Sequence, residues 1–424
     1  MSDDDVMPYA RFDSVEGLLQ RGRGLGAVRA LRDPLEAAPF VYDGIRRDWR
    51  WDGFDDRACY LAGLVGDLGL SPAPVVELLA GDEGQCRRAA EVLELLALDD
   101  CDEAREALRS HVREGAHWVS VLESVSRLWP LEWWEDLGEA ARARISGEPE
   151  PPWFTEPWTH FGIEVQRHDP GPPPHDLTGL ADDELLNLLA GSRPEAGSRV
   201  DALRELSRRD PVEGLIPLVP SLVTPDGCRP LPWLRRAVDR LGALAVPAAR
   251  WWADDEREWL ARLGSDVLSD HLGSEVIPVL VAELADQWRN RAWCGPEATA
   301  RRLARFGPAA SGAVADLRRF WLHTPHSYER AGYLEALAAI DPGGLDYTHT
   351  ESLWDCEERA RLLGIAHAPD HPETLERITA LCNDPMETPD VRADAEARLA
   401  ATTTPCLPSP DLDSQGPRCL PYYS

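Results

Sequence analysis

Residues 296 to 321 read PEATARRLARFGPAASGAVADLRRFW, and this stretch indicates how the chain folds. Its first half has alanine and leucine at helical spacing, and Gly307-Pro308 then ends the helix. Its second half places Val314, Leu317 and Trp321 three and four residues apart, so they form one apolar stripe. The stretch predicts two helices separated by a glycine-proline stop.

Helix stops of this kind recur along the chain at intervals of 30 to 36 residues within two groups. Repeats of this length are typical of helix pairs that cover one another's apolar faces. We therefore expect an all-α fold, a right-handed α-solenoid of nine or ten antiparallel helix pairs. The stops lie at Asp33-Pro34, Gly69, Asp99, Pro130, Asp210-Pro211, Gly242, Gly273, Gly307-Pro308 and Asp341-Pro342.

A segment with eight prolines, residues 147–176, separates the two groups. So many prolines exclude a helix pair. The segment also carries Trp153, Trp158 and Phe161, aromatic residues that a free linker does not need. We expect this insert to pack against the repeats, with residues 161–165 extended.

These features divide the chain into five parts. We expect an acidic tail at 1–13, N-terminal repeats at 14–146, the proline-rich insert at 147–176, C-terminal repeats at 177–400 and a disordered tail at 401–424.

The chain is strongly acidic, and all of its basic residues are arginine. There are 74 acidic and 44 basic residues, which give a net charge of −30. Without lysine the chain has no phosphate-loop lysine and no Schiff base. Nucleic acid and anionic membranes would be repelled unless an arginine stripe were folded onto one face. We therefore expect neither as a partner.

The cysteines and the N-terminus indicate a cytoplasmic protein. Nine cysteines are scattered along the chain, with no two separated by only two residues, as is typical of a reducing compartment. The first residues are acidic, whereas a secretory signal begins with a basic region. No uncharged run approaches the roughly 20 residues that a membrane helix needs.

Candidate metal and cofactor motifs are weak. The pairs His323/His326 and His367/His371 lie in proline-broken loops without a cysteine at metal spacing. The glycines between residues 22 and 26 follow no predicted strand, so they do not indicate a dinucleotide site. We expect no metal and no cofactor.

Three stretches carry a resemblance to a known family. RRLARFGPAA at 301–310, RRAVDRLG at 235–242 and VDALRELSRRDP at 200–211 are similar to the turn region of HEAT repeats. The resemblance covers most of residues 14–400. The overall character of the sequence is similar to that of HEAT-repeat proteins of actinobacteria. The resemblance implies an α-solenoid and says little about activity, because such arrays serve as scaffolds, transport factors and enzymes alike.

The sequence has few of the residues that the enzymes of the HEAT-repeat family require. The deoxyhypusine hydroxylase type requires His-Glu pairs, and the chain has none. The HEAT-like DNA glycosylases use a basic concave face, which a net charge of −30 disfavours. A phycobilin lyase-like or other ligand-handling protein stays open as an alternative. The main hypothesis is a non-enzymatic scaffold that binds a protein partner on its concave face.

Tryptophan and arginine are the candidate anchors, because tryptophan is enriched at interfaces. The resemblance implies that the second helix of each repeat lines the concave face, so residues that these helices expose become candidates. The opposing interpretation is that these aromatic residues only pack loops or helix ends. The candidate residues are Trp49, Trp51, Trp133, Trp251, Arg318 and Arg319.

Overall fold

The computed structural model describes residues 9–147, 156–165, 175–191 and 196–403. Within these ranges the chain forms 22 α-helices and several short 3-10 helices, and it forms no β-strand. The expectation of an all-α protein is therefore confirmed. No helix in the described ranges is both long enough and apolar enough to cross a lipid bilayer.

The first nine helices share one hydrophobic core. In the longest of them, Ala89, Leu93 and Leu96 are buried at three- and four-residue spacing, as an amphipathic helix requires. Asp82 caps this helix by accepting a hydrogen bond from the backbone N–H of Gln85. The nine are α1 (Val15–Gln20), α2 (Gly24–Arg32), α3 (Pro34–Arg46), α4 (Ala58–Asp67), α5 (Ala73–Glu77), α6 (Glu83–Leu98), α7 (Asp102–Glu114), α8 (Trp118–Leu128) and α9 (Gly138–Ile145).

The described part of the proline-rich insert packs into this same core. Trp158 is fully buried, and its indole N–H donates to Glu123 Oε1 at 2.7 Å. Phe161 is also buried. The expected packing of the insert is therefore observed in these residues. Residues 161–165 form a turn and irregular backbone and not a strand, and Trp153 lies outside the described residues.

The next five helices enclose a second core. Here α12 buries Leu234, Val238 and Leu241 on one face. These helices are α10 (Asp182–Ala190), α11 (Ala196–Leu206), α12 (Leu234–Leu241), α13 (Val246–Trp252) and α14 (Glu258–His271).

The remaining helices form two further cores. In the first of these, Leu317 and Trp321 are buried as the opening stretch predicts. The last helix continues to Thr403, so the first three residues of the predicted tail are helical, and the rest of that tail lies outside the described residues. The helices are α15 (Ile277–Arg289), α16 (Pro296–Ala304), α17 (Val314–His323), α18 (Arg330–Ile340), α19 (Asp346–Ser352), α20 (Glu358–His367), α21 (Pro372–Asn383) and α22 (Pro389–Thr403).

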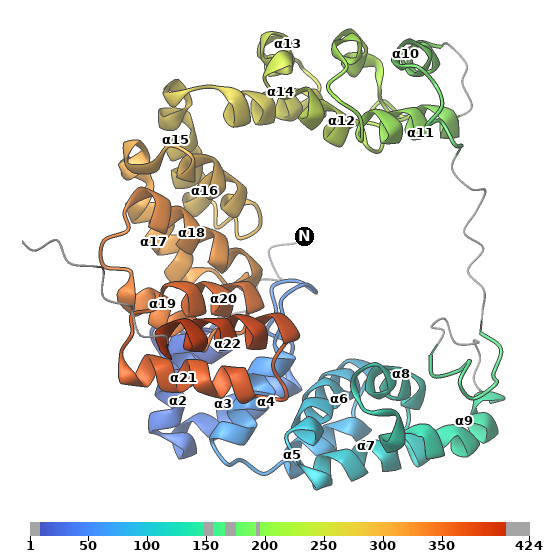
Figure 1. Cartoon of the computed structure of the whole chain (residues 1–424), viewed down its shortest axis with the longest axis vertical. Coiled ribbons are helices and arrows are strands. Elements are labelled where there is room, and N and C mark those ends of the chain that lie inside the picture. Colours follow the sequence, from blue (N-terminus) through green and yellow to red (C-terminus); the bar gives the residue numbers. More distant parts are fainter. Residues whose placement is uncertain (1–8, 148–155, 166–174, 192–195, 404–424) are drawn as a thin grey trace, which may run out of the picture.

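The helices follow an arc around a central opening (Figure 1). In the upper and left parts of this arc, α11, α12, α14 and α16 lie on the side of the opening, and α13 and α17 lie on the outside. The helices on the inside are those that precede each stop. The expectation that the second helix of each pair lines the concave side is therefore wrong for α13 and α17.

Five arginines bind backbone carbonyl groups that precede them by similar distances in the sequence. Arg305 donates to the carbonyl oxygens of Ser269 and Leu272 at 2.7 and 2.8 Å, where α14 ends. Carbonyl groups at the end of a helix lack intrahelical partners, so a guanidinium there supplies both hydrogen bonds and favourable charge. The carbonyl acceptors precede their arginine by 29 to 36 residues at Arg144, Arg209, Arg240, Arg305 and Arg398.

The two ends of the described chain meet through a buried ion pair and buried hydrogen bonds. Arg23 of the N-terminal segment binds Glu351 Oε1 through Nε at 2.8 Å and Nη2 at 2.6 Å, and both side chains are almost completely buried. Arg330 binds both carboxylate oxygens of Asp355 and donates to the carbonyl oxygen of Gly22. The Arg23–Glu351 pair and the Arg330–Gly22 hydrogen bond join residues 328 and 308 positions apart in sequence, whereas Asp355 holds Arg330 from within the C-terminal part.

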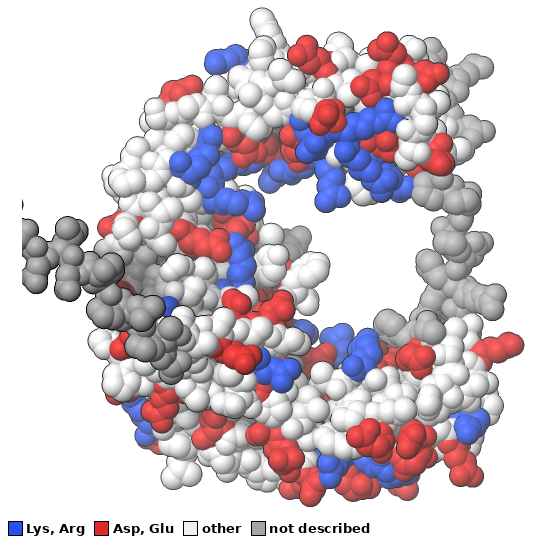
Figure 2. Space-filling view, in the orientation of Figure 1, with Lys and Arg blue, Asp and Glu red and all other residues white. Residues whose placement is uncertain are grey.

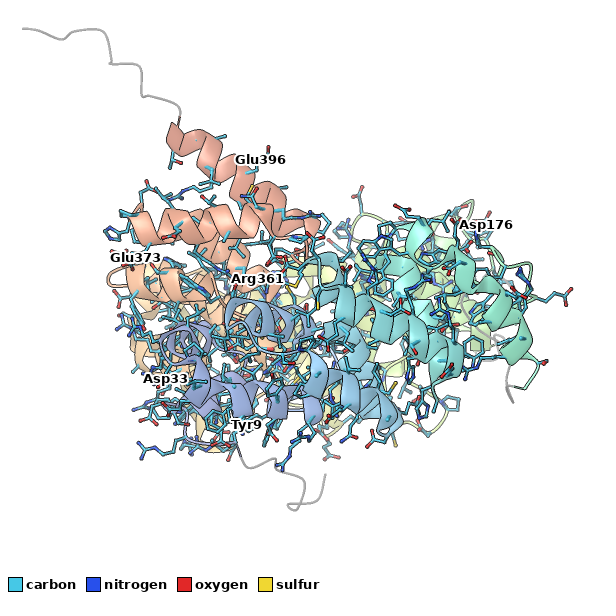
Figure 3. All side chains as sticks on the ribbon, turned by 90° about the horizontal axis from the view of Figure 1, so that it is seen from below. Tyr9, Asp33, Asp176, Arg361, Glu373 and Glu396 are labelled. Carbon is cyan, nitrogen blue, oxygen red and sulfur yellow. The ribbon has the colours of Figure 1, made fainter. Side chains whose placement is uncertain are left out.

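This junction forms one block of packed helices. Figure 3 views it from below and shows the N-terminal helices beside the C-terminal helices, with Arg361 among them. Arg361 is 2% exposed and pairs with Glu387 at 2.7 Å. The backbone N–H of Cys356 donates to the carbonyl oxygen of Gly22 at 3.0 Å, so a main-chain hydrogen bond also crosses the junction.

We predict that Arg23→Met lowers the free energy of unfolding by about 3–5 kcal/mol, because it leaves Glu351 buried and unpaired. Urea denaturation measures the change. The double variant Arg23→Met/Glu351→Met should recover most of the loss, since it removes both charges. As a control, Arg319→Met breaks an exposed pair with Asp316 and should cost less than about 1 kcal/mol. An Arg23→Met protein as stable as the control would contradict the prediction.

Candidate functional site: an arginine-lined inner face

Basic side chains gather on the inner edge of the arc, over α11, α12, α14 and α16 (Figure 2). Acidic side chains are more frequent on the outer edge in the same view. The sequence between residues 196 and 305 contains 16 arginines and 16 acidic residues, so it has no share in the net charge of −30. In this part of the chain the basic and acidic residues are equal in number, but the basic ones gather on the inner edge. The inner face therefore differs in charge from the rest of the surface.

Helix geometry explains why these arginines face the opening. In α12, Leu234, Val238 and Leu241 face the core, so Arg236 and Arg240 lie on the opposite side. The same register applies in α14 and α16, where Arg262 and Arg301 lie away from the buried residues, and Arg208 lies in the turn that follows α11. We define the arginine face as the exposed residues Arg208, Arg235, Arg236, Arg240, Arg262 and Arg301.

Carboxylates neutralise only some of this face. Asp266 of α14 pairs with Arg235 at 2.9 Å and with Arg302 at 2.8 Å, which ties three neighbouring helices together. Arg236 and Arg262 have no carboxylate partner among the described residues. Burial raises the pKa of Asp239, which lies on the same face. The face therefore has unpaired positive charge, interrupted by a few acidic side chains.

Tryptophans hold some of the arginines in place. The guanidinium groups of Arg204 and Arg236 each lie over the Trp233 indole, 5.3 Å from a ring centroid. The backbone φ of Trp233, 70°, is in the left-handed region, where a bulky residue is strained. Further along the arc, Arg291 stacks on Trp288 at 5.0 Å. A stacked guanidinium keeps the N–H groups at its edge free for a ligand.

The residues predicted on second helices are exposed, but these helices lie on the outside of the arc. Trp251 of α13 is 81% exposed. Arg318 and Arg319 of α17 are also exposed, and they pair with Asp341 and Asp316. None of the three belongs to the arginine face, because α13 and α17 form the outer row in Figure 1.

The other three predicted residues are structural parts of the N-terminal half. Trp49 is 9% exposed, and its indole N–H donates to Asp43 Oδ2 at 3.1 Å. Trp51 is half-buried, and its backbone N–H donates to Asp55. Trp133 is half-buried, stacks edge-on against Trp129 and contacts the guanidinium of Arg105. The structure thus does not bring the six predicted residues together.

A cluster at the junction of the chain ends has the donor atoms of a metal site. One ligand atom each from Asp52, Asp55 and His326 lies within 4.8 Å of the others. These groups are already hydrogen-bonded: His326 Nε2 contacts Asp52 Oδ2 at 2.6 Å, and Asp55 accepts from the backbone N–H groups of Trp51, Ser327 and Tyr328. The bonds join the loop at 47–57 to the loop before α18, which gives the cluster a structural role.

A hollow of about 510 Å³ lies at the same junction of the chain ends, between α2, α19 and α21. Its walls are mostly apolar and include Leu25, Val28 and Trp354. Arg32 and Glu373 lie on the rim with opposite charges. Glu351 also lines the hollow, but it is paired with Arg23, so the charged groups of the lining do not form a site for one kind of ion.

Sequence reasoning missed the arginine face because it asked which tryptophans the second helices expose. The signal was present in the sequence: Arg235, Arg236 and Arg240 occupy the positions between the buried residues of α12. Such a pattern defines a basic side of one helix. It does not define the side of the arc on which that helix lies.

Comparison with protein-family models, with curated proteins and with solved structures finds no match to this chain. The interpretation of the site therefore depends on its own geometry and charge.

We predict that the junction is stabilised by acid through Glu357. Burial raises the pKa of Glu357 to about 7, and its Oε1 accepts a hydrogen bond from Ser327 at 2.6 Å. A carboxyl whose pKa is higher in the folded state binds its proton more tightly there, so protonation favours folding. This contribution is complete below pH 4.5, the ordinary pKa of glutamate, and is lost as the pH rises through about 7.

Melting temperatures of wild type and Glu357→Gln between pH 5 and pH 8 measure the effect. The variant should lose this part of the pH dependence and should exceed wild type in stability at pH 8. Glu373→Gln, which removes an exposed carboxylate, should keep the wild-type profile. Parallel profiles for wild type and Glu357→Gln would refute the assignment.

Proposed function

We propose that this protein is a non-enzymatic adaptor of the HEAT-repeat type, an α-solenoid of antiparallel helix pairs that binds an acidic segment of a protein partner on its arginine face. The observation that carries the proposal is the unpaired charge of Arg236 and Arg262 on the inner side of an otherwise acidic protein. Unpaired guanidinium groups on one face attract carboxylates and fix their geometry through bidentate hydrogen bonds.

A protein segment fits this face better than nucleic acid does. Asp239, Asp266 and Asp270 lie among the arginines, and a continuous phosphate backbone would pass close to each of them. A peptide can place its carboxylates opposite Arg236 and Arg262 and leave the acidic positions opposite neutral residues. The net charge of −30 further opposes a polyanion that extends beyond the face.

The cytoplasm is the compartment we propose for this adaptor. The seven described cysteines are free thiols, a state that a reducing compartment maintains.

Peptide binding tests the proposal. A fluorescein-labelled glutamate-rich peptide of about 20 residues should bind wild type in fluorescence anisotropy, and its affinity should fall as salt increases. The triple variant Arg208→Glu/Arg236→Glu/Arg262→Glu should weaken binding at least about tenfold, because each substitution replaces attraction with repulsion. Trp251→Ala and Arg318→Glu change the outer row and should bind the peptide like wild type.

The same assay distinguishes the competing class of partner. Single-stranded and duplex DNA of about 20 nucleotides serve as competitors for the labelled peptide. If DNA displaces the peptide at lower concentration than unlabelled peptide does, the acidic-protein proposal is overturned in favour of nucleic acid. If the triple variant binds the peptide like wild type, the arginine face is not the site.

A further inference from the structure

A small pocket opens on the arginine face between α12 and α14. Its volume is about 150 Å³. One wall is the loop before α12, which is closed by a bridge between Val223 and Pro230 and by a hydrogen bond from Leu231 N to Leu222 O at 3.0 Å. The pocket is lined by Pro230, Arg235, Trp259, Arg262, Leu263 and Asp266.

The floor of the pocket is apolar. Leu263 is 6% exposed, and Trp259 is half-buried with the guanidinium of Arg257 5.6 Å from its ring. The indole Nε1 of Trp259 is buried and donates to no acceptor among the described residues. Such an apolar surface accommodates the methylene groups of a side chain.

The rim of the pocket has surplus positive charge. Asp266 is the only carboxylate among the lining residues, and both Arg235 and Arg302 pair with it. Arg262 has no carboxylate partner among the described residues. Arg235 uses Nη2 for its bond to Asp266 at 2.9 Å, and its side chain is 63% exposed, so it keeps further N–H donors for a ligand. An incoming anion meets two guanidinium groups without displacing Asp266 from Arg302.

The size of the pocket limits what can enter it. A volume of 150 Å³ corresponds to about five water molecules. Pockets for small-molecule ligands usually begin at roughly 300 Å³. One amino-acid side chain is therefore the appropriate size. The combination of an apolar floor and a cationic rim requires a side chain with methylene groups below an anionic end.

We infer that this pocket holds the side chain of a glutamate, with its methylene groups against Trp259 and Leu263 and its carboxylate on Arg262 and Arg235. This inference rests on the proposed binding of an acidic segment and identifies the residue that is bound most deeply. Aspartate is one methylene shorter, so its carboxylate reaches the arginines only by leaving the apolar floor. Glutamine fills the same space but lacks the charge.

A blocked single residue tests the pocket without a partner. N-acetylglutamate methylamide is titrated into ¹⁵N-labelled full-length protein, and the indole N–H signal of Trp259 is followed by NMR. Trp259→Phe assigns this signal by its loss. The signal should shift saturably with the glutamate compound, and the corresponding glutamine compound should require at least about tenfold higher concentration. The aspartate compound should also bind more weakly than the glutamate compound.

Arg262→Gln should raise the dissociation constant for the glutamate compound about tenfold. The control Arg250→Gln removes an exposed arginine of α13 and should leave it unchanged. Equal responses to the glutamate and glutamine compounds, or an unchanged affinity in Arg262→Gln, would overturn the inference.

The labelled acidic peptide separates this inference from the proposed function. If the peptide binds wild type and the triple variant fails to bind, while Trp259 does not respond to the glutamate compound, the face binds the segment without this pocket. If the glutamate compound binds and the peptide does not, the pocket is real and the adaptor proposal fails.

Discussion

Two buried arginines determine how the ends of this chain are held. Arg23 and Arg330 are each 1% exposed, so each needs a carboxylate and further acceptors to offset the loss of hydration. Glu351 and Asp355 supply the carboxylates from the C-terminal part. A guanidinium in such a site has few alternative positions, because an unpaired buried charge costs several kcal/mol. The junction therefore fixes the register between segments about 300 residues apart.

Arginine acts in two ways along the rest of the arc. Where a guanidinium reaches the end of the preceding helix, as Arg305 does, it satisfies free carbonyl groups and sets the distance between neighbouring turns. Where the helix turns the residue away from the core, as for Arg236, the guanidinium stays at the surface and stacks on a tryptophan. The first group maintains the geometry on which the second group depends. Because both roles exploit planar, multidentate donors, lysine could not replace arginine in either.

The sequence predicted the helices but not their arrangement in space. Local signals, such as Gly307-Pro308 and the stripe through Leu317 and Trp321, define elements that form as expected. A repeated pair has no intrinsic first helix, so the period alone cannot say which helix faces the opening, and the candidates on α13 and α17 were placed on the wrong side. The junction has no local signal either. A Cβ atom at Gly24 would lie 2.0 Å from the carbonyl oxygen of Glu351, a close approach that only the folded chain reveals.

The net charge of −30 and the arginine face act over different distances. At physiological ionic strength the Debye length is about 8 Å, so the acidic outer surface repels a partner weakly beyond that distance. Contacts with Arg236 and Arg262 act at hydrogen-bonding distance, where screening is small. An acidic segment therefore gains little binding energy on the outside of the arc and much more at the arginine face. The same arrangement disfavours long polyanions, because acidic side chains are more frequent on the outer edge than on the inner face. The net charge of the whole chain thus reflects the acidic outer surface. The proposed specificity for an acidic segment depends on the few arginines that the fold places on the inner face.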